Sequence, residues 1–197
     1  MASPVPMKYL TLKHREKRPR EYLYSHEVEA LIDAAKENRN AVRDQTLILM
    51  CYRHGLRASE ACAMTWAQVD FENLRLHVLR IKGGQDSVQP LRDREIRLLR
   101  RLWKERKHNS PYLFLTSTGT RLTVGNFQKI MLKLGQRAGL LVPQIHPHML
   151  RHSTGYKLAN DGVDTRVIQD YLGHTDIKNT VIYTKLSDKK FDKVFLD

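Results

Sequence analysis

The stretch HPHMLRHS, residues 146–153, places three histidines and one arginine within eight positions. Proline is favoured at the first position of a helix, so Pro147 indicates a helix that begins here. On that helix His148 and His152 are four residues apart and share a face, as zinc-binding histidines do. A methionine stands where a zinc metalloprotease motif has its glutamate, and Arg151 adds a positive charge beside any metal. The stretch therefore does not favour a metal site.

An anion site uses the same residues in another way. His148 and Arg151 are three residues apart, about 60° around a helix of 3.6 residues per turn. A guanidinium presents a planar fork of donors that matches phosphate oxygens, and a histidine adds a donor or a proton carrier. One such pair arises easily by chance, so the interpretation depends on residues elsewhere in the chain.

The composition indicates a polyanionic partner. The 197 residues include 34 Lys and Arg against 21 Asp and Glu, a formal net charge of +13. No window approaches the roughly 18 apolar residues of a transmembrane helix, and the N-terminus lacks an apolar signal core. Cys51 and Cys62 lie in apolar helical segments and are expected to be small core residues in a reducing compartment. These features favour a nucleic-acid-binding protein of the cytoplasm over a membrane protein.

The hydrophobic pattern predicts one domain, mainly α with a small antiparallel β-sheet. Helical spacing begins at Ser25, and two further helices are expected over 41–53 and 124–138. The segment 94–107 is an amphipathic helix with a cationic exterior. Its expected core face carries Ile96, Leu99 and Trp103.

Two segments have the pattern of strands. LRLHVLRI, residues 74–81, alternates and is rich in β-branched residues, and DSVQPL follows after two glycines. Together they predict a β-hairpin with Lys82 at its turn. YLFLT, residues 112–116, is expected to form a further short strand.

Further motifs extend the set of candidate residues. HGLRASE at 54–60 supplies Arg57 and Glu60, and IKGG at 81–84 supplies Lys82. LGH at 172–174 supplies His174, and VIYT at 181–184 supplies Tyr183. Together with HMLRHS, these motifs supply Arg, Lys, His, Arg, His and Tyr in that order along the chain.

The ordered set resembles the tyrosine recombinases, the phage-integrase type of site-specific DNA recombinase. The resemblance extends from about residue 25 to residue 186, which is most of the chain. Within that family, the chain most resembles the minimal bacterial recombinases that invert a promoter segment to switch fimbrial genes. The implied fold is the catalytic domain of that family, and the implied activity is the cutting and rejoining of DNA strands.

The resemblance implies a nucleophile and a pair of phosphate ligands. Tyr183 would attack a DNA phosphodiester and form a 3′-phosphotyrosyl bond. Arg57 and Arg151 would hold the non-bridging oxygens and stabilise the transition state, so that no metal, ATP or other cofactor is expected. Nearby cations would favour the phenolate of Tyr183.

The resemblance also assigns the proton transfers. Lys82 would protonate the departing 5′-oxygen. His148 would assist proton transfer or bind the phosphate, and His174 would hydrogen-bond it. Glu60 would orient the arginines or His152, which is expected to be a supporting, hydrogen-bonded histidine.

Each assignment has a simpler alternative. Tyr183 alone would be a packed aromatic residue, and Lys82 alone a solvated turn lysine. Lys185 and Arg80 lie near enough in sequence to compete for the role of Lys82. Arg57 alone would be a helix C-terminal cation.

The expected organisation is a basic N-terminal arm at 1–22, a catalytic domain at 23–187 and a C-terminal tail or exchange helix at 188–197. No separate N-terminal DNA-clamping domain is expected. The apolar stripe of the tail fits docking either on its own domain or on a neighbour. The resemblance implies double-stranded DNA with paired recombination sites as partner, a tetramer on DNA and a monomer when free. Accessory DNA-bending proteins and a location on the bacterial nucleoid are also expected.

Two other function classes share these residues. One is a DNA-binding regulator of the same fold without strand exchange, which the complete residue set disfavours. The other is a nicking enzyme of the topoisomerase kind, with the same chemistry but without choice of site.

Overall fold

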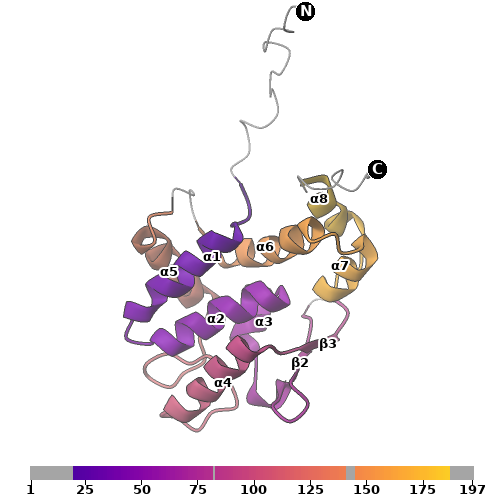
Figure 1. The fold of residues 1–197 in the computed structure, drawn as a ribbon. Coiled ribbons are helices and arrows are strands. Elements are labelled where there is room, and N and C mark those ends of the chain that lie inside the picture. Colours follow the sequence, from indigo (N-terminus) through magenta and orange to yellow (C-terminus); the bar gives the residue numbers. More distant parts are fainter. Residues whose placement is uncertain (1–19, 82, 141–144, 187–197) are drawn as a thin grey trace, which may run out of the picture.

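The computed structural model describes residues 20–81, 83–140 and 145–186. Within these residues the chain is mainly helical, with a small sheet at one side (Figure 1). The α-helices are α1 (Ser25–Ala34), α2 (Ala41–His54), α3 (Ala58–Ala63), α4 (Asp93–Glu105), α5 (Val124–Arg137), α6 (Pro147–Asn160), α7 (Thr165–Leu172) and α8 (Lys178–Leu186). The shorter elements are the 3-10 helices η2 (Ala35–Glu37) and η3 (Trp66–Gln68) and the strands β1 (Val69–Asp70), β2 (Arg75–Val78) and β3 (Ser87–Pro90). The predicted fold class is confirmed.

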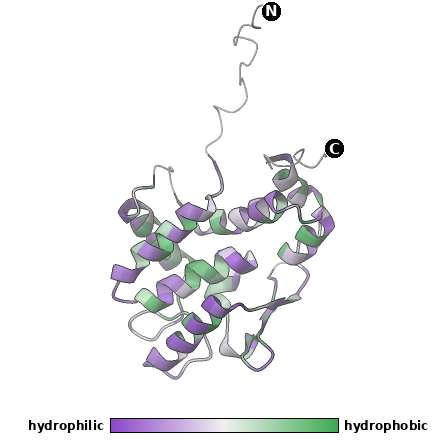
Figure 2. Ribbon diagram, viewed as in Figure 1, coloured by the Kyte–Doolittle hydropathy of each residue, from purple (hydrophilic) through white to green (hydrophobic). Residues whose placement is uncertain are grey.

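Helix α2 forms the centre of the domain. Eleven of its fourteen residues are buried, and it packs against α4 on one side and α6 on the other (Figure 1). The outward face of α4 is strongly hydrophilic (Figure 2). Cys51 and Cys62 are buried free thiols, as predicted. A second, smaller cluster of Ile168, Leu172 and Tyr183 packs α7 and α8 together.

The sheet is antiparallel with the order β1-β2-β3. Leu76 pairs with Gln89 and Val78 with Ser87, so the predicted hairpin is confirmed. Its turn residue Lys82 lies outside the described residues. Buried and exposed residues alternate along the first arm of the hairpin, and this alternation continues past the end of β2 to a buried Arg80.

Two local predictions are wrong. YLFLT forms isolated bridges, Thr65 with Tyr112 and Leu115 with Arg121, rather than a strand. Its consecutive residues 113 and 114 are both buried, which breaks the alternation of a strand on a sheet face. The second concerns the last turn of α4.

Trp103 is not a core residue of α4. Ile96 and Leu99 are buried as predicted, but Trp103 is 44% exposed. Its ring packs edge-on against Trp66, with centroids 4.8 Å apart, and the guanidinium of Arg106 lies over it. The last turn of α4 therefore reaches beyond the core and packs against η3. Over the described residues, no helix is long and apolar enough to cross a membrane.

Candidate active site

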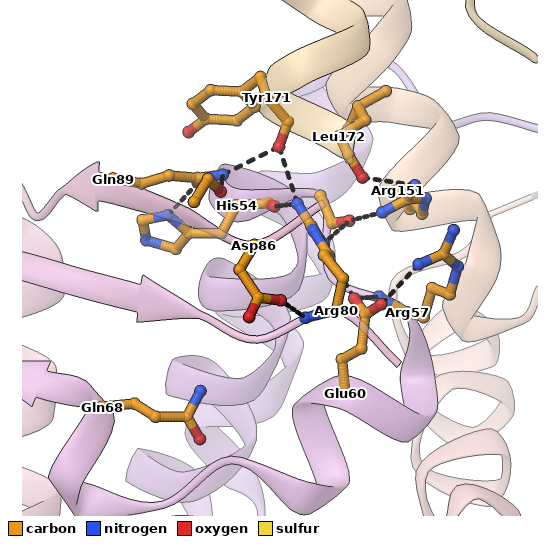
Figure 3. Close-up of polar contacts among 12 residues, drawn as sticks. His54, Arg57, Glu60, Gln68, Arg80, Asp86, Gln89, Arg151, Tyr171 and Leu172 are labelled. Atoms are coloured by element: carbon orange, nitrogen blue, oxygen red, sulfur yellow. Dashed lines mark hydrogen bonds and ion pairs between the residues drawn. The ribbon is translucent and has the colours of Figure 1, made fainter. Parts of the chain in front are cut away.

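The C-terminal ends of α2 and α7 meet at the centre of the site. Each helix ends at a glycine in the left-handed conformation, Gly55 with φ 56° and Gly173 with φ 66°. The last carbonyls of a helix have no partner within it. Here carbonyls from the two ends accept hydrogen bonds from two buried arginines, Arg80 and Arg151 (Figure 3). The two helix ends are thereby joined through cations, which the negative end of the helix dipole favours.

Arg151 projects from the middle of α6 into this junction. It is 1% exposed, and its Nη1 donates to the carbonyl of Gly55, while Nη2 donates to that of Leu172 at 2.8 Å. Burial, together with the charges of Arg80 and Arg57, lowers the pKa of Arg151 to about 10. The guanidinium therefore remains charged at neutral pH.

Arg57 and Glu60 form a capping box at the start of α3. The carboxylate of Glu60 accepts from the backbone N–H of Arg57 at 2.8 Å and from its Nη1 at 2.6 Å. The Arg57 side chain is 28% exposed, whereas that of Glu60 is 1% exposed. Arg57 is thus held at the surface by a buried carboxylate. It stands at the N-cap of α3, two residues after the C-cap Gly55 of α2, and its side chain bonds to Glu60.

The charge of Glu60 is maintained despite its burial. Burial alone would raise the pKa of this carboxyl, but hydrogen bonds from Arg57 and the charge of Arg80 outweigh it and lower the pKa. In the described structure Glu60 bonds to the two arginines and has no bond to His152. Of its two expected tasks, the structure supports orientation of arginines.

Tyr183 lies on α8 with its ring buried against α6. It is 3% exposed, and its hydroxyl lies 3.0 Å from Nδ1 of His152. The ring of His174 is nearly parallel to it, with centroids 6.3 Å apart. Burial raises the pKa of Tyr183 and exceeds the opposing influence of Arg151 and Arg57. The arginines act in the predicted direction, but the net effect does not favour the phenolate.

His152 is more central than the sequence indicated. Besides its contact with the tyrosine, its ring meets that of His148 edge-on, with centroids 4.5 Å apart. Burial first, and then the charges of His148 and Arg151, lower the pKa of His152 to about 4, so this ring is neutral at pH 7. A neutral imidazole can accept the proton of a phenol. His152, rather than the more exposed His148, contacts the expected nucleophile.

His174 lies just after the end of α7. Its Nδ1 is 2.8 Å from the hydroxyl of Thr180, and burial, assisted by the nearby arginines, lowers its pKa to about 4. In the tautomer whose Nδ1 accepts from the Thr180 hydroxyl, a neutral His174 carries its one N–H at Nε2, where it can donate to a ligand. No group of three or more acidic, cysteine or histidine side chains among the described residues is placed to hold a metal ion.

Lys82 cannot be placed, because it lies outside the described residues. The two residues that compete for its role, Arg80 and Lys185, can be placed. The side chain of Arg80 is 0% exposed, and each of its two Nη groups makes two hydrogen bonds within the protein. No Nη hydrogen of Arg80 is therefore left to protonate a leaving group. Lys185 is exposed on α8, two residues after Tyr183.

Sequence reasoning missed Arg80 as a member of the site. A signal was present, because strand residues two apart point to the same side. Leu76 and Val78 point inward, so Arg80 should also do so. A buried pair, His54 with Glu95 at 2.6 Å, was missed as well, and no pattern in the sequence distinguishes it.

The close packing of Tyr183 on Gly155 predicts a strong effect of one methyl group. A Cβ at Gly155 would lie 2.5 Å from Cε2 of Tyr183 and 2.6 Å from Cδ2. We expect Gly155→Ala to displace the ring, to lower the free energy of unfolding by about 1–3 kcal/mol, and to slow any reaction of the hydroxyl about tenfold or more.

The measurements are thermal unfolding and the rate of covalent attachment to DNA. Gly125→Ala, in α5, is the matched control, because a Cβ there meets only Thr123 Oγ1 at 3.9 Å. That variant should unfold at the same temperature or higher. Equal behaviour of the two variants would contradict the packing argument.

The chain is similar in sequence to known proteins. Residues 21–190 match the phage integrase family. The type 1 fimbriae regulatory protein FimB of Escherichia coli strain K12 is 38% identical over 181 residues, covering 89% of this chain and 90% of FimB.

Solved structures agree. The crystal structure of XerA recombinase is 26% identical with a TM-score of 0.76, covering 89% of this chain and 64% of that one. The XerH site-specific recombinase bound to palindromic difH substrate is 25% identical with a TM-score of 0.74, covering 87% of this chain and 51% of that one.

The fold and the grouped side chains define a tyrosine recombinase, an enzyme of site-specific DNA recombination. The chain belongs to the phage integrase family, and the match covers most of its length. The resemblance inferred from the motifs is confirmed.

Proposed function

We propose that this recombinase cuts and rejoins DNA through a 3′-phosphotyrosyl intermediate formed by Tyr183. The observation that carries the proposal is the position of the Tyr183 hydroxyl, 3.0 Å from a ring nitrogen of His152. The helix that holds His152 also carries Arg151 one residue earlier, with Arg57 near enough to influence both Arg151 and Tyr183. A nucleophile, a proton acceptor and phosphate-binding cations therefore occupy one site.

The chemical step balances with these groups. The Tyr183 oxygen forms a bond to phosphorus, the bond from phosphorus to the 5′-oxygen breaks, and the tyrosine proton passes to His152. Arg57 and Arg151 stabilise the charge on the non-bridging oxygens. Lys82 protonates the departing 5′-oxygen.

The remaining histidines act on the phosphate. His148 binds it or assists the proton transfers, and His174 donates a hydrogen bond to it. Glu60 holds Arg57 in place. Rejoining is the reverse, in which a 5′-hydroxyl attacks the phosphotyrosyl bond, so its energy is conserved without ATP.

The partner is double-stranded DNA. The formal charge of +13 and the DNA-bound state of the similar XerH recombinase support it. The likeness to FimB supports inversion of a DNA segment between paired sites as the outcome. We further propose that the protein is a monomer when free, forms a tetramer on DNA and acts with accessory DNA-bending proteins. The proposed organisation is a basic arm at 1–22, a catalytic domain at 23–187 and a terminal tail or exchange helix at 188–197.

A suicide substrate tests the proposal. A nicked duplex built on the inverted repeats beside the gene would lose a short strand after cleavage and trap the intermediate. Incubation with the protein in EDTA should give a protein–DNA adduct that survives denaturation in SDS. Absence of any adduct on bound DNA would favour the regulator without strand exchange, and dependence on added metal would contradict the mechanism.

DNA binding should depend steeply on salt. Each phosphate neutralised by lysine or arginine releases counterions, so the log–log slope of affinity against salt is about −0.9 for each contact. We expect a slope steeper than about −2, measured by fluorescence anisotropy on a labelled duplex. A shallower slope would contradict a model of extensive phosphate contacts.

A further inference from the structure

Arg80 is a fully buried guanidinium outside the family motifs described above. Its side chain is 0% exposed. Nη1 donates to Glu60 at 2.9 Å and to the carbonyl of Gly55 at 3.1 Å. Nη2 donates to the carbonyls of Tyr171 at 2.7 Å and His54 at 3.2 Å. Four acceptors from three parts of the chain therefore converge on one side chain (Figure 3).

Two of these acceptors are shared with the phosphate-binding arginines. One oxygen of Glu60 accepts from Arg80 and the other from the side chain of Arg57. The carbonyl of Gly55 accepts from both Arg80 and Arg151. Arg80 therefore shares one hydrogen-bond acceptor with each of the two arginines that would hold the scissile phosphate.

The surroundings leave Arg80 little freedom. A Cβ at Gly84 would lie 2.8 Å from the Cβ of Arg80, and a Cβ at Gly173 would lie 2.9 Å from its Cγ. Both glycines thus allow the hairpin and the end of α7 to close on the side chain. The backbone N–H of Arg80 is also fixed, because it donates to Asp86 across the hairpin at 2.6 Å.

The cluster carries an excess of positive charge. Three guanidinium groups, those of Arg57, Arg80 and Arg151, surround the single carboxylate of Glu60, which leaves a net charge of +2. A phosphodiester carries −1 and gains a second negative charge in a pentacovalent transition state. Burial of like charges is costly unless a counter-charge arrives, so the cluster is suited to bind that transition state more tightly than the ground state.

We propose that Arg80 is a positioning residue for strand cleavage: by holding Glu60 and the Gly55 carbonyl, it sets Arg57 and Arg151 for the scissile phosphate. The inference rests on the proposed function, because it assumes that these two arginines bind the phosphate. Arg80 itself touches no substrate. It should therefore affect the rate of cleavage and leave DNA affinity almost unchanged.

A double-mutant cycle tests this role. The variants are Arg80→Met, Arg57→Ala and the pair, with single-turnover cleavage of the suicide duplex as the readout. Misplacement of a catalytic group by about 1 Å costs on the order of 100-fold in rate, so we expect Arg80→Met to cleave 10- to 100-fold more slowly. Its Kd for DNA should stay within about threefold of wild type. In the Arg57→Ala background the same change should cost clearly less than in the wild-type protein, because only the route through the Gly55 carbonyl to Arg151 remains.

Controls separate this role from a loss of folding and from failure of the mechanism. Arg75→Met removes an exposed arginine from the same arm of the hairpin and should cleave as wild type. If Arg80→Met does not fold, Glu60→Gln replaces it, because Arg57 and Arg80 bond to different oxygens of Glu60 and the amide replaces one of these acceptors by an NH2 donor. Multiplicative effects in the cycle, or wild-type cleavage by a folded Arg80→Met, would overturn the inference. Formation of a Tyr183 adduct by the wild-type protein tests the proposed function independently.

Discussion

Tyr183→Phe should form no detectable covalent adduct with the suicide duplex, because the attacking oxygen is gone. The rate of adduct formation should fall by at least about 10³-fold relative to wild type. The variant should fold normally. Within the part of the chain that the structure describes, the hydroxyl bonds to His152, and the loss of one such bond costs about 1 kcal/mol. Unfolding temperature and DNA affinity should therefore stay close to those of wild type, which the same preparation can verify by thermal melting and anisotropy.

A neighbouring tyrosine supplies the control. Tyr171 lies on α7, and its hydroxyl donates to the carbonyl of Arg53 at 2.8 Å. Tyr171→Phe removes an equivalent hydroxyl that faces away from the expected chemistry, so its adduct should form at nearly the wild-type rate. An adduct that persists in Tyr183→Phe would contradict the assignment of the nucleophile, whatever the behaviour of the control.

Helices and the hairpin followed from the sequence because local signals determine them. Pro147 and Gly55 mark helix ends through their backbone preferences, and the alternation in 74–81 marks a strand. The errors arose where the tertiary environment decides. Trp103 has helical spacing with the core residues of α4, but its ring packs edge-on against Trp66 of η3 and remains 44% exposed.

The sequence predicts a set of candidate residues but not the network among them. The motifs indicate Arg57, Arg151 and Tyr183 as candidates because the expected chemistry restricts the residue types. The bonds among them depend on how α2, α6 and α7 meet, and no local pattern encodes that. For this reason the sequence ranked His148 above His152, whereas the structure places His152 against Tyr183, the expected nucleophile. It also left Arg80 outside the site.

Arg151→Met should abolish cleavage and leave stability almost unchanged. Removal of a preorganised donor to a developing negative charge typically costs 10²–10³ in rate, so we expect a loss of about 10³-fold or more. Two opposing effects act on folding. The carbonyl of Leu172 loses its charged donor, which costs about 1–3 kcal/mol, whereas the carbonyl of Gly55 keeps its bond from Arg80.

Relief of a buried charge offsets that loss. Burial, together with the charges of the neighbouring arginines, lowers the pKa of Arg151 from its usual value to about 10, which corresponds to about 3 kcal/mol against the charged form. The melting temperature should then stay within about 5 °C of wild type. Glu60→Ala is the contrast, because it leaves Arg57 and Arg80 without their carboxylate and should destabilise the fold by about 3–5 kcal/mol.

An added anion distinguishes this balance from a simple packing role for Arg151. If the cluster is short of negative charge, sulfate at millimolar concentration should raise the melting temperature of the wild-type protein by binding the folded state. The rise should be much smaller in Arg151→Met, since one of the two cations available to the ion is gone. A melting temperature more than about 10 °C below wild type, or an equal response to sulfate in both proteins, would show that Arg151 serves the fold. The expected result instead indicates that the buried charge of Arg151 lowers the free energy of unfolding, and that a bound phosphate supplies the negative charge that the cluster lacks.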